Sequence, residues 1–241
     1  MQCVGVIGLG RLGQGIAASL AYAGFDVVGH DVSQQRLTGS AAFVRQACQE
    51  IANHSENRVH DQSVSHSYCA VESLAGFEIC DFVIESITEE REKKSLTLEQ
   101  LEAIVRSDVP LASNTSAIPI SDMQQQLRRP ERLVGMHFAE PVHATRFLEI
   151  IPGERTSESV VHAALALGCA MGKEPCVLRK DVPGFIANRL GYALYREALH
   201  LLQTGVADAE TIDRSFRNSL GLWSSVCGPF QWMDISGGAL L

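Results

Sequence analysis

Near its start the chain carries Val4-Gly5-Val6-Ile7-Gly8-Leu9-Gly10-Arg11-Leu12-Gly13. Residues 4–7 form a short apolar run rich in β-branched side chains, which is typical of a buried strand. The small and apolar residues at 15–21 predict a helix, and residues 26–30 predict a second strand that ends at Asp31. A strand, a Gly-x-Gly-x-x-Gly turn, a helix, a second strand and an acidic residue in this order are typical of a dinucleotide-binding unit.

Each part of this unit has a physical role. Gly8 permits the tight turn, Gly10 lets a pyrophosphate approach the backbone, and Gly13 allows the helix to pack closely on the strand. The free amides and the positive end of the helix favour phosphate. Asp31 stands where a carboxylate can bind both ribose hydroxyls, and it would repel a 2′-phosphate, so it favours NAD over NADP.

Arg11 could contact the pyrophosphate or lie in solvent. The alternative for the whole motif is a glycine-rich turn in another kind of α/β protein. We therefore expect NAD as cofactor, bound by Gly8, Gly10, Arg11, Leu12, Gly13 and Asp31.

The composition narrows the class of protein. With 241 residues, 46% hydrophobic and 20% charged, the chain can form one α/β domain and a small second one. The net charge of −8 without a basic tract argues against a nucleic-acid partner, and no apolar run approaches the ~20 residues of a membrane helix. The chain enters its first strand without a leader, and its seven cysteines form no Cys-x-x-Cys pair, so we expect a cytoplasmic protein with reduced thiols. His54, His60 and His66 lack zinc-ligand spacing and are expected in solvent, and no metal is expected.

Strands and helices continue to alternate after Asp31. We expect helices at 33–53, 89–106, 118–127 and 157–171, strands at 81–87, 109–113, 132–138, 147–151 and 176–178, and a polar loop at 54–65. This alternation predicts an α/β fold with a Rossmann-type, doubly wound, mostly parallel sheet.

At Lys180-Asp181-Val182-Pro183-Gly184 the pattern changes to helices only, predicted at 185–203, 208–219 and from 230 onward. We therefore expect an NAD-binding domain at 1–181 and a small all-α C-terminal domain at 182–241. An apolar stripe on the first of these helices needs a cover, and it consists of Leu190, Leu194, Ala198, Leu201 and Leu202.

Four polar residues stand where such a fold carries out its chemistry. Ser116 and His137 follow or end predicted strands, Glu149 lies within an apolar strand, and Asn188 follows a Pro-Gly turn. Oxidation of an alcohol by NAD needs a base for the hydroxyl proton, and histidine exchanges protons near neutral pH. A buried carboxylate beside the imidazole would stabilise the imidazolium, while Ser116 and Asn188 could bond the substrate oxygen. The alternatives are a structural histidine and a strand-edge acid that faces water.

At these residues the chain resembles the 3-hydroxyacyl-CoA dehydrogenase family, which includes the lambda-crystallin/gulonate and carnitine dehydrogenase branches. The matching motifs run from residue 4 to about 234 and comprise Gly8–Ala17, Asp31, Asp81–Glu85, Ser113–Ser116, Gly135–Phe138, Phe147–Glu149 and Asp181–Arg189. The resemblance implies that His137 is the catalytic base, that Glu149 orients it, and that Ser116 and Asn188 line the site. It also implies that Glu89 and Lys94 contact the cofactor, although the residues alone suggest an exposed helix start and a surface charge.

Three departures from the family pattern bear on the substrate. Members that act on acyl-CoA usually carry His-Phe-Phe-Asn-Pro, whereas this chain has His137-Phe138-Ala139-Glu140-Pro141, which places a carboxylate at the substrate site. The segment after Asp31, which helps hold CoA in those members, is short here and offers only Arg36, Arg45 and Arg58. The C-terminal domain is shorter than the family norm, either by truncation or by nature.

The resemblance implies an NAD-dependent enzyme of fatty acid metabolism that interconverts an L-3-hydroxyacyl thioester and its 3-oxoacyl form. The expected partner is a small molecule, with Ser116, Glu140 and Asn188 as substrate-binding residues, and the protein is expected to be a homodimer. Glu140 keeps two alternatives open, a small 3-hydroxy acid and an acyl group on a carrier protein. A third alternative is a crystallin-like protein that binds NAD without turnover.

Overall fold

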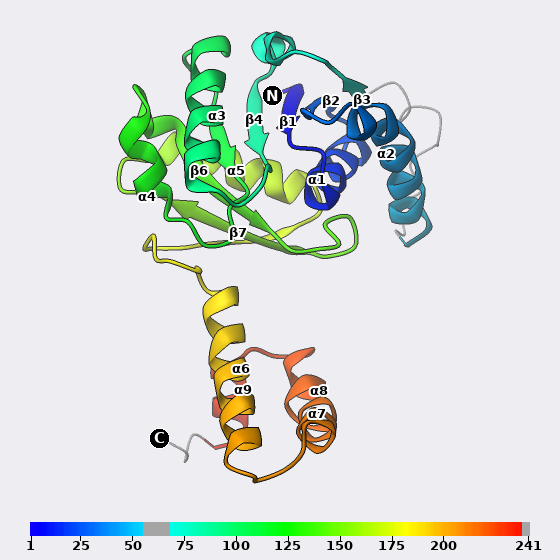
Figure 1. Cartoon of the computed structure of the whole chain (residues 1–241), viewed down its shortest axis with the longest axis vertical. Coiled ribbons are helices and arrows are strands. Elements are labelled where there is room, and N and C mark those ends of the chain that lie inside the picture. The colour runs from blue at the N-terminus through cyan, green and yellow to red at the C-terminus, as the bar shows by residue number, and fades with distance from the viewer. Residues whose placement is uncertain (55–67, 238–241) are drawn as a thin grey trace. The chain divides into compact units, whose positions relative to one another are not determined.

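The computed structural model describes residues 1–54 and 68–237 (Figure 1). The chain divides into two compact units, Met1–Phe185 and Ile186–Leu241. The predicted loop at 54–65 and the side chains of His54, His60 and His66 lie outside what the structure describes. Each unit is described by itself below.

The first unit is built on an eight-stranded sheet in the order β3-β2-β1-β4-β5-β6-β7-β8. Neighbouring strands are parallel except β6 and β7, which are antiparallel. The strands are β1 Cys3–Ile7, β2 Asp26–His30, β3 Tyr68–Ala70, β4 Phe82–Glu85, β5 Leu111–Ser113, β6 Leu133–Phe138, β7 Phe147–Pro152 and β8 Glu174–Val177. The doubly wound, mostly parallel sheet predicted from the sequence is confirmed.

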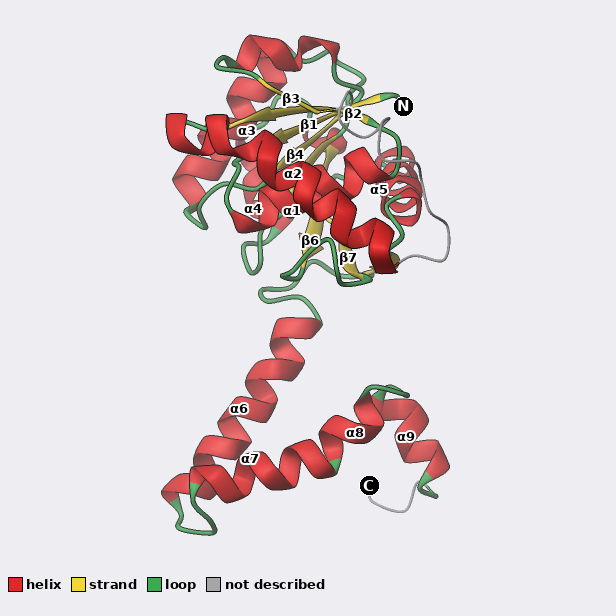
Figure 2. Cartoon of the chain, turned by 90° about the vertical axis from the view of Figure 1, so that its right-hand side faces the viewer, coloured by secondary structure: helices red, strands yellow, loops and turns green. Residues whose placement is uncertain are grey.

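Helices cover both faces of this sheet (Figure 2). The helices are α1 Arg11–Tyr22, α2 Gln34–His54, α3 Arg91–Ile104, α4 Ile120–Met123 and α5 Glu158–Ala170, with 3-10 turns η2 Leu74–Ile79, η3 Gln124–Gln126 and η4 Pro130–Arg132. One buried apolar cluster joins α1, α2 and α5 to the sheet, and a second joins η2, α3 and α4 to it.

Strand β1 shows how the sequence assigns side chains to the two faces. Val4 and Val6 belong to the first cluster, whereas Cys3 and Ile7 belong to the second, as the two-residue period of a strand requires. Gly5 points to the second face, where a Cβ would overlap the ring of Phe77. The strand is therefore buried on both faces, which is why its residues form an uninterrupted apolar run.

Strand β3 and the 3-10 turns η2 and η4 are not among the elements predicted from the sequence. Strand β3 has only three residues, of which Cys69 and Ala70 are exposed, so it carries no apolar alternation. Turn η2 buries a single residue, Phe77. The helix expected at 118–127 is shorter than predicted, since α4 has four residues and continues as the 3-10 turn η3.

The second unit contains α6 Ala187–Gln203, α7 Ala209–Asn218, α8 Leu220–Ser224 and α9 Pro229–Ile235. Asp208 caps α7 by accepting a hydrogen bond from the Thr211 amide, as its position before the helix predicts. The rings of Trp223 and Trp232 stack 4.8 Å apart. None of the residues of α6 is buried. Among the described residues, no helix is long and apolar enough to cross a bilayer.

Candidate active site

The glycine-rich turn has the geometry that a pyrophosphate needs. Gly8 has φ +91°, and a Cβ on Gly13 would overlap the Gly8 carbonyl oxygen, so α1 packs directly on the turn. At Gly10, the N-cap residue of α1, a Cβ would meet no atom within 4 Å, and no side chain caps the helix there. The start of α1 thus lines the groove without a capping side chain, beside a turn at Gly8 that favours glycine, and this fits a dinucleotide phosphate.

Asp31 lies directly after β2 and is buried, with 5% of its surface exposed. The amide of Leu9 donates to Oδ2 and the amide of Ser33 donates to Oδ1, each over 2.8 Å. The guanidinium of Arg36 also reaches Oδ2, at 3.3 Å. The carboxylate is therefore fixed at the end of the strand, where the sequence predicts the ribose site.

A groove of about 840 Å³ runs along this edge of the sheet. It passes the ends of β1, β2, β4 and β5, and its lining includes Gly8, Gly10, Asp31, Ser86, Glu89 and Ser116. In the strand order, β1 lies between β2 and β4, so the winding reverses at this edge. Ligands of doubly wound sheets bind at such a reversal.

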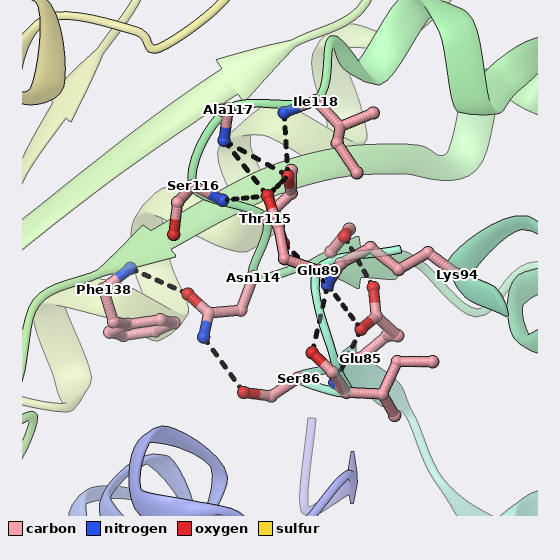
Figure 3. A network of polar contacts seen from close by, with 12 residues as sticks. Glu85, Ser86, Glu89, Lys94, Asn114, Thr115, Ser116, Ala117, Ile118 and Phe138 are labelled. Atoms are coloured by element: carbon pink, nitrogen blue, oxygen red, sulfur yellow. Dashed lines mark hydrogen bonds and ion pairs between the residues drawn. The ribbon is translucent and has the colours of Figure 1, made fainter. Parts of the chain in front are cut away.

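Behind the groove lies a buried ion cluster (Figure 3). Lys94 is fully buried, and its Nζ lies 2.8 Å from Glu85 Oε1 and 3.4 Å from Glu89 Oε2. Glu85 is also fully buried, and its Oε2 accepts a 2.6 Å hydrogen bond from Ser113. The interpretation of Lys94 as a surface charge is wrong, because the chain encloses its ammonium between two carboxylates.

Glu89 connects this cluster to the turn that carries Ser116 (Figure 3). Its Oε1 accepts hydrogen bonds from the Thr115 hydroxyl at 2.6 Å and the Ser116 amide at 2.9 Å. Burial would raise the pKa of Glu89, but these hydrogen bonds and the charge of Lys94 outweigh it and lower the pKa below the ordinary value. Glu89 thus remains an anion that holds the Ser116 turn in place.

Asn114 bridges neighbouring strand ends (Figure 3). Its amide nitrogen donates to Ser86 Oγ after β4, and its oxygen accepts from the Phe138 amide at the end of β6, both over 3.0 Å. Phe138 directly follows His137. One side chain therefore sets the spacing between the groove and the strand that carries the candidate base.

His137 and Glu149 are direct neighbours on the antiparallel strands β6 and β7. His137 Nδ1 lies 2.8 Å from Glu149 Oε2, and the side chains are 9% and 2% exposed. The rings of Phe147 and Phe185 lie 5.5 Å and 5.6 Å from the imidazole. Because the Glu149 carboxylate accepts this hydrogen bond, the imidazole Nδ1 carries the hydrogen. The other ring nitrogen, Nε2, makes no hydrogen bond to the described residues and keeps its lone pair. This arrangement can take a proton from a substrate hydroxyl.

Arg11 and Glu140 form an ion pair at the rim of the groove, with Nη1 and Oε1 3.1 Å apart. Both side chains are exposed, by 86% and 47%.

Asn188 lies in the first turn of α6, in the second unit, and its predicted role at the site stays a prediction. Leu12 lies in the first turn of α1 and lines the groove with Arg11.

Sequence reasoning missed Glu85, Thr115 and Asn114 as residues that shape the site. Glu85 carried a usable signal, because it is an acid at the end of the apolar run 82–84, as Glu149 is within its own strand. Such an acid needs a buried cation or hydrogen-bond donors. Nothing in the local sequence distinguishes Lys94 from Lys93, which is exposed.

The comparisons with known proteins show the family. Residues 3–182 match "3-hydroxyacyl-CoA dehydrogenase, NAD binding domain", and residues 184–240 match the C-terminal domain of the same family. A 5-formyl-3-hydroxy-2-methylpyridine 4-carboxylate 5-dehydrogenase of Mesorhizobium japonicum is 33% identical, over 97% of this chain and 75% of that protein. A probable 3-hydroxybutyryl-CoA dehydrogenase of Deinococcus radiodurans is 34% identical, over 97% of this chain and 82% of that protein.

The fold is also similar to that of a solved structure. The crystal structure of an NAD⁺-dependent 5-formyl-3-hydroxy-2-methylpyridine 4-carboxylic acid 5-dehydrogenase superposes on this chain with a TM-score of 0.89 at 31% sequence identity. The match covers 98% of this chain and 76% of that one.

Proposed function

Since the chain belongs to the 3-hydroxyacyl-CoA dehydrogenase family of NAD-dependent oxidoreductases, we propose that it interconverts an L-3-hydroxyacyl thioester and the corresponding 3-oxoacyl thioester. The observation that carries the proposal is the buried His137–Glu149 pair at the end of β6. The alternative of a protein that binds NAD without turnover is disfavoured because the chain keeps Ser116, His137, Glu149 and Asn188 together.

The residues of the groove divide the work of binding. The amides at the start of α1 and the turn at Gly8 and Gly10 hold the pyrophosphate, and Asp31 holds the adenosine ribose. Bound NAD supplies the hydride acceptor for the C3 hydrogen of the substrate. Glu89 holds the turn that carries Ser116 at the side of the groove by accepting a hydrogen bond from the Ser116 amide.

His137 carries out the proton transfer. Its Nε2 takes the proton of the C3 hydroxyl while the C3 hydrogen leaves as hydride, so the alcohol becomes a ketone and the imidazole becomes an imidazolium. Glu149 stabilises that imidazolium across 2.8 Å in a site that excludes most water. Ser116 and Asn188 provide hydrogen bonds to the substrate oxygens.

The second candidate substrate is a small hydroxy acid without CoA. Two observations favour it: Glu140 places a carboxylate at the rim, and a relative at 33% identity is named for a compact pyridine carboxylate. An acyl group on a carrier protein is the third option. Membership in the family keeps the CoA ester first.

The test is the oxidation of NADH by the purified chain with acetoacetyl-CoA, an acetoacetyl carrier protein and a small 3-oxo acid in parallel. Turnover on the CoA ester supports the first proposal, and turnover on another substrate alone moves the assignment to that class. His137→Gln should abolish turnover while NADH binding, measured by fluorescence, persists. Undiminished turnover in that variant would overturn the mechanism.

The protein is also proposed to form a homodimer in the cytoplasm, in a pathway of fatty acid metabolism. Apolar side chains of α6 are exposed and need a cover, among them Leu190, Tyr195 and Leu199 at 56%, 60% and 55%. Light scattering on the purified chain tests the dimer, and Leu199→Asp should shift it toward monomer.

A further inference from the structure

Phe185 has an unusual backbone conformation. Among the residues that the structure describes, it is the one non-glycine residue with a positive φ, at +52°. Side chains rarely adopt this left-handed conformation, because the Cβ then crowds the carbonyl oxygen that follows. Gly184, directly before it, also has a positive φ, of +76°. Glycine would fit both positions without strain, so a phenylalanine at the second one indicates that its ring has a role.

Contacts within the first unit fix the turn that carries this ring. The amide of Phe185 donates to the carbonyl oxygen of Val182 at 3.0 Å, and the carboxylate of Asp181 accepts from the Ser121 amide in α4 over 2.7 Å. Phe185 is 1% exposed and belongs to the buried cluster on the face of the sheet that α3 and α4 cover. Described residues of the first unit therefore hold the ring in place.

The His137–Glu149 pair lies on this same face. Along β7 the side chains of Phe147, Glu149 and Ile151 share one face, and Ile151 belongs to the same buried cluster as Phe185. The ring of Phe185 lies 5.6 Å from the imidazole at an angle of 54°, and that of Phe147 meets the imidazole edge-on at 5.5 Å. Two apolar rings from separate segments thus pack against the candidate base.

We propose that Phe185 is a positioning residue of the dehydrogenase, whose ring keeps water from the His137–Glu149 pair and holds the imidazole in one orientation. Water at the pair would screen the attraction between the carboxylate and the imidazolium that forms in the reaction. An imidazole that packs against two rings also turns less freely, so Nε2 keeps its direction toward the substrate hydroxyl. The inference rests on the proposed function, because Phe185 acts in it only through His137.

The test compares kcat in three variants of Phe185. Phe185→Ala should lower kcat about 10- to 100-fold, while the affinity for NADH changes less than about twofold, since Phe185 does not line the groove. Phe185→Gly should lose as much, although glycine fits the positive φ, because both variants lack the ring. Phe185→Leu should keep kcat within about threefold of wild type, because leucine still covers the pair with an apolar side chain.

Phe82→Ala is the matched control. Phe82 is also fully buried, but it belongs to the cluster on the other face of the sheet. This variant should lower the free energy of unfolding as Phe185→Ala does, and its kcat should stay within about twofold of wild type. An equal loss of kcat in Phe82→Ala would reduce the effect of Phe185 to general destabilisation and overturn the inference. Wild-type kcat in Phe185→Ala or in Phe185→Gly would overturn it too.

The Nδ1 proton of His137 reports the shielding without turnover. In NMR spectra of protein labelled with ¹⁵N-histidine, this proton, which is shared with Glu149, should exchange slowly with water in the wild type and at least about tenfold faster in Phe185→Ala. Equally slow exchange in both would show that the ring does not shield the pair and would overturn the inference. Undiminished turnover in His137→Gln would instead overturn the proposed function, and the exchange rates would then decide on the shielding by themselves.

Discussion

Glu149 lies directly opposite His137 in the β6–β7 ladder, and its Oε2 is 2.8 Å from the imidazole Nδ1. The two residues are twelve positions apart in sequence, and only the antiparallel pairing of these strands brings them together. The pair is buried, so the Glu149 carboxylate would act on an imidazolium formed at His137 with little screening by water.

Replacement of Glu149 by Gln should lower kcat about 10²-fold or more, because the imidazolium loses its charge partner while a hydrogen-bond acceptor remains. NADH binding, measured separately by fluorescence, should change by less than about twofold, since Glu149 does not line the groove. A variant with wild-type kcat would contradict the proposed role.

Lys94→Met should destabilise the first unit by about 3–5 kcal/mol, because it leaves the buried carboxylate of Glu85 without its cation. The measurement is the free energy of unfolding in urea. Lys93→Met is the matched control, since Lys93 is 60% exposed and pairs with an exposed glutamate, and its effect should stay within about 0.5 kcal/mol. Equal losses of unfolding free energy in the two variants would show that the buried position of Lys94 adds nothing to the stability that an exposed lysine provides.

Lys173 should make stability depend on pH in the alkaline range. Its ammonium donates to the backbone oxygens of Val142 and Thr145, and burial lowers its pKa from 10.5 to about 8. Between these values the unfolded chain holds a proton that the folded chain has released, so the free energy of unfolding should rise from pH 8 to 10.5.

This contribution should disappear in Lys173→Met and persist in Lys180→Met, which removes an exposed lysine. The comparison is between the slopes of unfolding free energy against pH in the three proteins. A slope in Lys173→Met that equals the wild-type slope would assign the pH dependence to other groups.

Glu140→Asn should raise kcat/KM for acetoacetyl-CoA by roughly 2- to 5-fold, mainly through KM, because it removes an anion from the rim of the groove. The gain should shrink at high salt, where exposed charges are screened. Glu174→Gln breaks a comparable exposed pair with Arg146 and should leave kcat/KM unchanged. A lower value in Glu140→Asn would favour a substrate that Glu140 attracts.

The elements that the sequence predicts well are those whose own residues allow a single local structure. The turn at Gly8, Gly10 and Gly13 is such a case, because Gly8 has a positive φ and Gly13 has no room for a Cβ. Strands β1, β4 and β6 are buried along their length, so their apolar runs identify them without ambiguity.

What could not be predicted depends on contacts between distant segments. Lys94 stands in the charged run Arg91-Glu92-Lys93-Lys94, which resembles any exposed helix start, and only the position of Glu85 at the end of β4 explains its burial. The pairing of Arg11 with Glu140 spans 129 positions and follows from where β6 ends beside the glycine turn. Strand β3 is recognised only through its pairing with β2.

The side chain of Asn114 links the glycine turn to the strand that carries His137. It holds Ser86, whose backbone packs against Gly8, and at the same time the amide next to His137. A shift of the glycine turn would therefore reach the strand that carries His137 through these contacts. We therefore expect changes at the cofactor end of this groove to preserve the geometry of His137 only where they keep both hydrogen bonds of Asn114, a residue outside the proposed proton transfer.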